Sequence, residues 1–371
     1  MKKKLKTILF LGTSKIQINS ILSAKKFGFK IVGVDQNQFS TGKKYCDYFI
    51  KSNCNEVNFI FNKIIKYKNL KIIDIWANND ILLISRNKLL TKLKLKLENK
   101  TSTVYDLLNK KKFKYLFPEN TIKNPKKKYP LLAKPILGSG SQGIIFLKNT
   151  NEYLHFRNKK KFIFEKYINN LKEYGINFFN DGNKVLILNS VYRYFDHRIT
   201  YAPLGTVEVN NNKIIKILNK IKKKIFKLKI LGKIKIDLGV YKKKFIIIEA
   251  SPRFHGEIDT SIMFSNNGNS LADFYFSKLS GIKKIDRLKK NNFLYGYFVC
   301  YKKTSIHNLK KIFKKNRINF VQLLKRDNYV NKKIQFKNLS TKNIYGYAFY
   351  KINKKISDKN FTNISHHINN F

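Results

Sequence analysis

Two acidic residues that follow apolar stretches are the strongest candidates for chemistry in this chain. Asp237 ends the run Lys-Ile-Lys-Ile-Asp, and Glu249 follows the run Phe-Ile-Ile-Ile. A short turn at 241–244 separates the runs, so the pattern predicts antiparallel strands in which the two carboxylates approach each other. Adjacent carboxylates repel unless a cation lies between them, and Mg²⁺ accepts such oxygen ligands together with nucleotide phosphates. A pair of solvated acids at strand ends is the alternative.

A glycine-rich segment is a candidate phosphate-binding loop. Residues 138–143 read Gly-Ser-Gly-Ser-Gln-Gly and match G-x-G-x-x-G. The segment lies between strand-like stretches at 129–136 and 144–147, whereas a dinucleotide or Walker loop leads into a helix, and no G-K-[ST] is present. Because glycine lets backbone amides approach phosphates closely, we predict a flap over a nucleotide, with an ordinary hairpin as the alternative.

The order of the motifs argues against two familiar nucleotide-binding classes. Asp237-Leu-Gly resembles the metal-binding triplet of protein kinases, but Lys134 precedes the glycine loop and no H-R-D-x-x-x-x-N segment precedes Asp237. Asp35 lies about twenty residues after Gly12, where a ribose-binding acid would stand, yet the turn at Gly12 has one glycine where the dinucleotide fingerprint needs three.

Hydrophobic periodicity predicts the elements that position these residues. Strands at 7–12, 30–35 and 72–76 alternate with helices at 16–27, 57–67 and from 81 onward, which is typical of a parallel, doubly wound sheet. Further elements are a short helix at 104–117, strands at 162–168, 174–179, 184–193, 204–209, 234–241, 244–250 and 293–300, and helices at 213–227 and 269–280. We expect domain bounds at 1–103, 104–285 (with a lid subdomain at about 110–167) and 286–371.

The composition is strongly basic. The 371 residues have a formal net charge of +55, with 77 Lys and Arg against 22 Asp and Glu. Only eight of the basic residues are Arg, the type that makes bidentate contacts to phosphates and bases, and the Lys residues are scattered along the chain. Abundant Lys, Asn, Ile, Phe and Tyr favour an AT-rich coding sequence. A polyanion-binding or nucleic-acid-binding protein is the alternative from a different class.

Cysteine usage and apolar runs bear on the compartment. Cys46, Cys54 and Cys300 fit no disulfide framework, and no Cys/His spacing indicates zinc. No apolar run is long enough for a transmembrane helix, and the run of about six apolar residues after the basic start is shorter than that of a signal peptide. We therefore expect a cytoplasmic protein.

Taken in order, these motifs resemble the ATP-grasp superfamily over residues 7–280. The resemblance implies an α/β chain: a Rossmann-like pre-ATP-grasp domain, an ATP-grasp fold of two α+β subdomains, and a small β-rich or α+β C-terminal subdomain. It also implies ATP-binding residues. Lys110 (or its neighbours Lys111 and Lys112) and Lys134 would contact the phosphates. The flap, the adenine-binding hinge and a ribose-binding acid would be provided by Gly138, Ser139, Gly140, Ser141, Gly143, Glu165, Lys166, Tyr167, Ile168 and Glu173.

The resemblance assigns the C-terminal motif to metal binding and catalysis. Asp237 and Glu249 would hold Mg²⁺ or Mn²⁺, and Arg253, with Lys134, would act on the transferred phosphate. Many family members have Asn two residues after the glutamate. Here Ser251 stands in that place, as in formyltransferase-like members, and it is a candidate third ligand.

The implied activity is that of an ATP-dependent carboxylate–amine ligase, which activates a carboxylate as an acyl-phosphate and releases ADP and phosphate. An ATP-grasp carboxylase or a formate-dependent transformylase of nucleotide biosynthesis is the alternative within the family. We expect a small carboxylate and an amine as partners and no specific nucleic acid or membrane, with a homodimer as the candidate assembly. Arg193 and Arg198 are candidates to bind the substrate carboxylate, with surface packing as the alternative. His255, Glu257 and Asp259 follow the Ser-Pro-Arg turn, where a second substrate would enter, and His255 is a candidate acid or base, with a structural histidine as the alternative.

Overall fold

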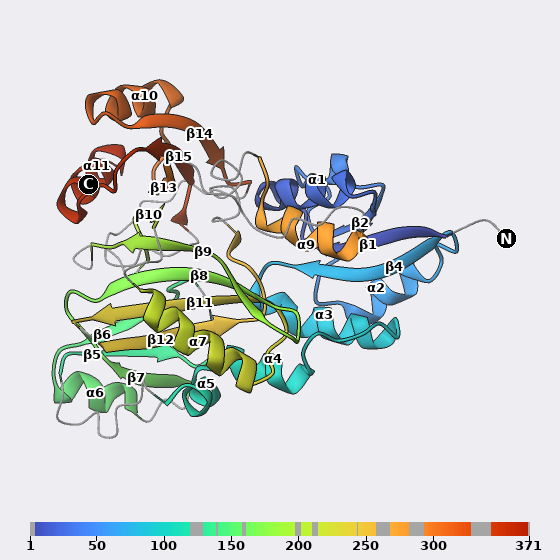
Figure 1. Cartoon of the computed structure of the whole chain (residues 1–371), viewed down its shortest axis with the longest axis horizontal. Coiled ribbons are helices and arrows are strands. Elements are labelled where there is room, and N and C mark those ends of the chain that lie inside the picture. Colours follow the sequence, from blue (N-terminus) through green and yellow to red (C-terminus); the bar gives the residue numbers. More distant parts are fainter. Residues whose placement is uncertain are drawn as a thin grey trace.

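The chain folds into three adjoining parts (Figure 1). The computed structural model describes residues 4–118, 129–138, 140–157, 161–196, 202–209, 214–242, 244–256, 268–281, 293–327 and 343–369. Among these residues, no helix has both the length and the apolar character that crossing a membrane requires. The three cysteines are free thiols, as the sequence predicts.

The N-terminal part is a four-stranded parallel sheet in the order β3-β2-β1-β4, which confirms the predicted doubly wound arrangement. Because side chains alternate along a strand, Ile8 and Phe10 pack toward α1 and α9, while Leu9 and Leu11 pack toward α2 and α3 on the other face. The elements are β1 (Leu5–Leu11), η1 (Lys15–Gln17), α1 (Ile18–Lys26), β2 (Lys30–Asp35), η2 (Lys43–Tyr45), β3 (Tyr48–Lys51), α2 (Val57–Ile64), β4 (Leu70–Ala77) and α3 (Asp80–Lys92), with α9 at Leu271–Ser280.

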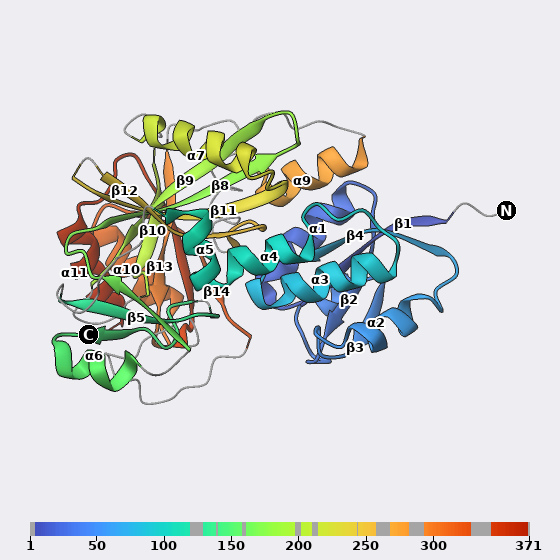
Figure 2. The same ribbon diagram turned by 90° about the horizontal axis from the view of Figure 1, so that it is seen from below.

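Two short helices lead from this part toward the small sheet, as Figure 2 shows. The single helix predicted at 104–117 is wrong in one respect, since α4 (Thr101–Leu108) and α5 (Lys110–Leu116) are separated at Asn109. Asn109 has an extended backbone, and its side-chain oxygen accepts hydrogen bonds from the amides of Lys111 and Lys112, both at 3.1 Å. This side-chain cap starts α5 in a new direction.

The small sheet is antiparallel, in the order β6-β5-β7, and α6 covers it. Its elements are β5 (Leu131–Pro135), β6 (Ile145–Leu147), α6 (Thr150–Arg157) and β7 (Phe162–Lys166). The glycine segment joins β5 to β6, as the flap prediction requires. The helix α6 was not predicted.

The largest element is an eight-stranded antiparallel sheet in the order β12-β11-β8-β9-β10-β13-β15-β14. Its strands are β8 (Lys172–Asn180), β9 (Val185–Tyr194), β10 (Gly205–Glu208), β11 (Gly232–Tyr241), β12 (Lys244–Ser251), β13 (Leu294–Cys300), β14 (Asn319–Lys325) and β15 (Gly346–Ile352), and its helices are α7 (Ile215–Lys227), α10 (Ile306–Lys315) and α11 (Asp358–Asn369). The strands β13, β15 and β14, which belong to the expected third domain, continue the sheet of the second. The helix α9, which belongs to the expected second domain, packs on α1 of the first. The domain bounds expected from the sequence therefore stay a prediction.

Candidate active site

The hairpin of β11 and β12 brings together the two acids that the sequence singles out. Asp237 is the direct register partner of Glu249, and a bulge follows between Asp237 and Leu238. This confirms the predicted antiparallel pairing of the two runs. Strand alternation places Lys235, two residues before Asp237, on the same face of the sheet.

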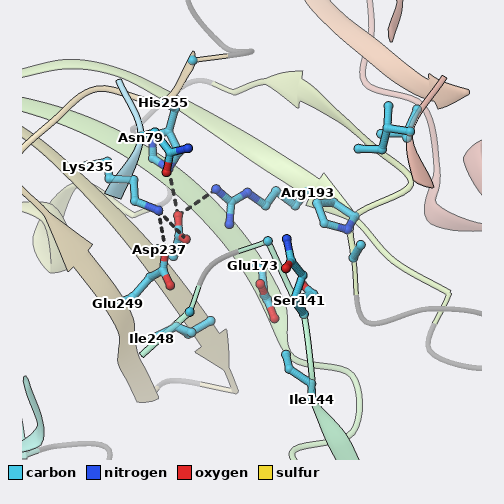
Figure 3. A pocket seen from close by; sticks show the side chains of 18 of the residues that line it. Asn79, Ser141, Ile144, Glu173, Arg193, Lys235, Asp237, Ile248, Glu249 and His255 are labelled. Carbon is cyan, nitrogen blue, oxygen red and sulfur yellow. Dashed lines mark hydrogen bonds and ion pairs between the residues drawn. The ribbon is translucent and has the colours of Figure 1, made fainter. Parts of the chain in front are cut away.

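Lys235 supplies the positive charge among these carboxylates (Figure 3). Its buried ammonium group contacts the carboxylate of Glu249 and lies 3.7 Å from Asp237 Oδ2 and 3.9 Å from Asp80 Oδ2. Burial opposes the charge of Lys235, but Glu249, Asp237 and Asp80 more than offset this effect, so the pKa of Lys235 is raised. The carboxylates are therefore already arranged around a cation.

Asp237 has two further partners, which reach it from β9 and from the segment after β12. Arg193 Nη2 lies 2.7 Å and His255 Nε2 lies 2.8 Å from Asp237 Oδ1. Burial raises the pKa of Asp237, but Arg193 and Lys235 outweigh that effect and hold it well below its usual range. Burial also lowers the pKa of His255 to about 4. Asn177 Oδ1 accepts a hydrogen bond from the backbone amide of His255 at 3.0 Å, which fixes this segment.

Lys110 and Lys134, which are predicted to bind phosphate, line one cavity together with Asp237 and Glu249. Lys134 Nζ, on β5, forms a 2.6 Å ion pair with Glu165 on β7, and Lys114 Nζ lies 3.6 Å from the same carboxylate. Lys110 donates a hydrogen bond to the backbone oxygen of Gly138 at 2.8 Å. Lys112 instead pairs with Asp106 at the surface, so Lys110 is the one of the two that lies at the cavity.

Several residues of the glycine loop have a left-handed backbone conformation, which glycine permits. Gly140 and Gly143 have φ values of 65° and 70°, in the left-handed region that glycine adopts without strain. Ser141 also lies there, with a φ of 59°. A Cβ added to Gly143 would come within 3.0 Å of Pro135 Cγ, so the loop is closely packed against the end of β5.

Arg253 and Ser251 both meet Asp80, which comes from the N-terminal part of the chain. Arg253 donates from Nε to Asp80 Oδ1 at 2.7 Å and from Nη2 to Oδ2 at 2.6 Å, a bidentate arrangement. The Ser251 hydroxyl donates to Asp80 Oδ1 at 2.6 Å. Burial raises the pKa of Asp80, but Arg253 and Lys235 lower it by more, so the carboxylate stays ionised.

A cavity of about 410 Å³ joins these groups. The predicted site residues that line it are Lys110, Lys134, Gly138, Gly140, Ser141, Glu173, Arg193, Asp237, Glu249, Arg253 and His255. Those that do not line it are Gly143, Glu165, Lys166, Tyr167, Ile168 and Ser251. Ser139, Arg198, Glu257 and Asp259 lie outside the described residues.

The part of the sequence that contains these residues matches a known family of protein domains. Residues 97–257 match the family model described as "ATP-grasp domain". Residues 97–257 form an ATP-grasp domain. No curated protein sequence matches the chain.

Solved structures share the fold of the ATP-grasp domain and of the flanking parts. The chain is 13% identical to the L-amino acid ligase from Bacillus licheniformis, with a TM-score of 0.73 and coverage of 99% of this chain and 98% of that one. It is 13% identical to N5-carboxyaminoimidazole synthetase from Staphylococcus aureus complexed with ADP, with a TM-score of 0.71 and the same coverages. The biotin carboxylase domain of Hydrogenobacter thermophilus 2-oxoglutarate carboxylase, in complex with MgADP and bicarbonate, gives 12% identity, a TM-score of 0.67 and coverages of 94% and 86%.

The ATP-grasp site contains residues that could hold a divalent cation. Asp237 and Glu249 are oxygen donors on adjacent strands, and the Lys235 ammonium group shows that positive charge is favourable beside them. In the part of the chain that the structure describes, no group of three or more His, Cys, Asp and Glu side chains is arranged for a metal. A cation here would therefore need ligands beyond the two carboxylates, such as the phosphates of a nucleotide.

Sequence reasoning missed three residues of the site. Lys235 stands two residues before Asp237 on a strand, and Lys114 stands one helical turn after Lys110. In both cases the spacing predicts that the lysine lies on the same face as the residue already identified. Asp80 has no such signal, because its contacts to Arg253 depend on how two distant parts of the chain pack. No local pattern could have revealed it.

Proposed function

We propose that this chain is an ATP-dependent ligase that activates a carboxylate as an acyl-phosphate and joins it to an amine. The observation that supports this best is the opposed pair Asp237 and Glu249, which faces one cavity together with Lys110, Lys134 and the glycine flap. This combination provides positive charge for phosphates and two carboxylates for a cation in one cavity.

In the proposed reaction, Lys110 and Lys134 neutralise the ATP phosphates, while the flap limits the access of water. The Glu165 carboxylate holds Lys134 in place from β7, so this ammonium group is positioned before the nucleotide binds. Glu173 lines the same cavity and is a candidate partner for the ribose hydroxyls. Lys166, Tyr167 and Ile168 remain candidates for adenine contacts, at the end of β7.

Asp237 and Glu249 would hold Mg²⁺ or Mn²⁺. Such a cation would neutralise charge on the transferred phosphoryl group. Arg193 and His255 hold Asp237 from the other side, which fixes the direction of its carboxylate. Ser251 remains a candidate ligand, although its hydroxyl donates to Asp80 in this structure.

The substrate carboxylate would attack the γ-phosphorus of ATP, and the bond from that phosphorus to the β,γ-bridging oxygen would break, releasing ADP. The amine nitrogen would then attack the acyl carbon, and inorganic phosphate would leave with the electrons of the carbon–oxygen bond. Arg253 is the candidate for stabilising charge on the transferred phosphoryl group, because its side chain lines the cavity beside Glu249.

A carboxylase or a formate-dependent transformylase is the second candidate. It is favoured by the likeness of the fold to a carboxyaminoimidazole synthetase and to a biotin carboxylase domain. These enzymes would share the nucleotide side of the site and differ in the acid. The basic surface keeps a polyanion-binding role as a third candidate. That role predicts salt-sensitive DNA or RNA binding that survives Glu249→Gln.

A hydroxylamine-trapping screen with Mg-ATP and a panel of carboxylic acids, including formate and bicarbonate, tests the proposal. Hydroxylamine replaces the unknown amine, so a reactive acyl-phosphate is recorded as a hydroxamate. We expect acid-dependent hydroxamate with an equal amount of ADP. Glu249→Gln should abolish it, whereas Glu56→Gln, at an exposed position outside the cavity, should not. ATP binding without hydroxamate from any amino or aliphatic acid would shift the proposal toward one-carbon chemistry.

A further inference from the structure

We propose that Asp80 is a positioning residue: the N-terminal part of the chain supplies the carboxylate that fixes Arg253 at the phosphoryl end of the ATP-grasp site. This inference rests on the proposed function only for the role of Arg253 in phosphoryl transfer. The positioning itself follows from contacts in the structure and can be tested without turnover.

The contacts between Asp80 and Arg253 fix the plane of the guanidinium. Two parallel hydrogen bonds, at 2.7 Å and 2.6 Å, join Nε and Nη2 to the two carboxylate oxygens. Nη1 donates to the backbone oxygen of Phe254 at 2.9 Å, which restrains the third nitrogen. Each side chain of the pair is only 13% exposed, so water screens the pair poorly. A guanidinium held in this way reaches any ligand in the cavity in one orientation.

Asp80 is itself firmly held. It is the first residue of α3, and the side chain of Asn79 caps this helix by accepting a hydrogen bond from the Ile81 amide at 3.2 Å. A carboxylate at a helix N-terminus is also stabilised by the helix dipole. The helix packs into the N-terminal core through Leu83 and Leu89, so Asp80 moves only with that part of the chain.

Asp80 also takes part in the charge balance of the carboxylate pair. Lys235 Nζ lies 3.9 Å from Asp80 Oδ2 and contacts Glu249, so Asp80 shares one ammonium group with Glu249 and Asp237. The Ser251 hydroxyl, which donates to Asp80, stands two residues after Glu249 on β12. Asp80 therefore contacts the end of β12 that carries the proposed catalytic arginine and the candidate ligand Ser251.

Other contacts join the N-terminal part to the large sheet and its continuation without involving Asp80 or Arg253. Asn99 exchanges two hydrogen bonds with the backbone of Leu231, at 2.8 Å and 2.9 Å. Asp327 accepts hydrogen bonds from the Lys15 amide at 2.8 Å and from the Thr41 hydroxyl at 3.0 Å. Holding the parts of the chain together therefore does not require Asp80, and Asp327 offers a matched control.

The first test uses nuclear magnetic resonance of the arginine Nε–H groups, since the chain has only eight arginines. Arg253→Lys assigns the signal. We expect a sharp, slowly exchanging Arg253 signal in the wild-type protein and in Asp327→Asn, and its loss or rapid exchange in Asp80→Asn. Asp80→Glu should restore it in part. An unchanged, protected signal in Asp80→Asn would overturn the proposal, whether or not the protein proves to be a ligase.

The second test uses hydroxamate formation. If Asp80 acts through Arg253, Asp80→Asn should lower kcat by about 10- to 100-fold and change the KM for ATP by much less. In an Arg253→Ala background the same substitution should cost nothing further, because the residue it positions is gone. Equal losses in both backgrounds would show that Asp80 acts independently of Arg253. No hydroxamate from the wild-type protein would count against the proposed function and leave the resonance test to decide the positioning.

Discussion

Asp237 on β11 stands directly opposite Glu249 on β12, and the ammonium group of Lys235 contacts the second while lying 3.7 Å from the first. Buried Asp237 and Lys235 and partly exposed Glu249 thus lie together with a favourable arrangement of charge. In the proposed enzyme, a divalent cation and Lys235 would share the task of neutralising the two carboxylates, and the first prediction follows from this relationship.

Lys235→Met should destabilise the ligand-free protein, by about 1–3 kcal/mol, because it leaves Glu249 without its ammonium partner and removes one positive charge beside Asp237 and Asp80, which keep Arg193 and Arg253. Adding Mn²⁺ and ADP should recover much of this loss, since a cation can occupy the space beside Asp237 and Glu249. Thermal unfolding with and without Mn-ADP measures both effects. A loss of stability that Mn-ADP does not reduce more than in the wild-type protein would contradict a cation site at this pair.

Asp237→Asn should retain the fold and lower turnover by at least about 100-fold, because the proposed cation site loses one of its two carboxylates. The matched substitution is Asp181→Asn in the turn between β8 and β9, outside the cavity. Hydroxamate formation and thermal unfolding, measured on both variants, separate loss of function from loss of fold. Near-normal activity of Asp237→Asn would refute its assignment.

Lys110→Met should weaken ATP and ADP binding by about 10-fold or more, because it removes a charge that faces the phosphate side of the cavity. Lys112→Met should have little effect, since Lys112 is 54% exposed and pairs with Asp106 at the surface. Calorimetric titration with ADP compares the two. Equal losses for both variants would mean that the neighbouring lysine also reaches the nucleotide.

The stability of the ligand-free protein should depend on the charge of Glu173. Burial raises the pKa of the Glu173 carboxyl to about 7, with Arg193 and Lys134 lowering it and Asp237 and Glu249 raising it further. Because this pKa lies above that of an unfolded chain, the native state binds the proton more tightly, and stability falls as pH rises through the range from about 4.5 to 7.

Glu173→Gln removes that contribution, so the variant should gain about 1–3 kcal/mol relative to the wild-type protein between pH 5 and pH 8. Unfolding of both proteins at the two pH values measures the difference, with Glu56→Gln as the control. Parallel stability curves would show that Glu173 keeps an ordinary pKa in the native state.

The alternation of apolar and charged residues made much of the fold predictable. The alternating run before Asp237 and the continuous apolar run before Glu249 predicted their strands and their pairing, because a short turn leaves few other registers. The glycine loop was placed correctly between β5 and β6, because short apolar, strand-like stretches flank it on both sides. In contrast, β3 (Tyr48–Lys51) has only four residues, too few for a periodic signal.

The rest depends on contacts between parts far apart in the sequence. Asp80 reaches Arg253 only because α3 of the N-terminal part packs beside the end of β12. The helix predicted at 269–280 was found as α9, but its packing on α1 could not be read from its own residues. The break at Asn109 was missed because a helix and its continuation share one amphipathic pattern, while a single side-chain cap redirects the chain.

Transfer of labelled oxygen tests the central claim most directly. The acid that yields hydroxamate is prepared with ¹⁸O in its carboxylate and incubated with the enzyme, Mg-ATP and hydroxylamine. An acyl-phosphate intermediate predicts that one ¹⁸O atom appears in each inorganic phosphate released, because the attacking carboxylate oxygen leaves with the phosphorus. Phosphate free of ¹⁸O would show that the carboxylate never attacks the γ-phosphorus, and it would contradict the proposed ligase chemistry.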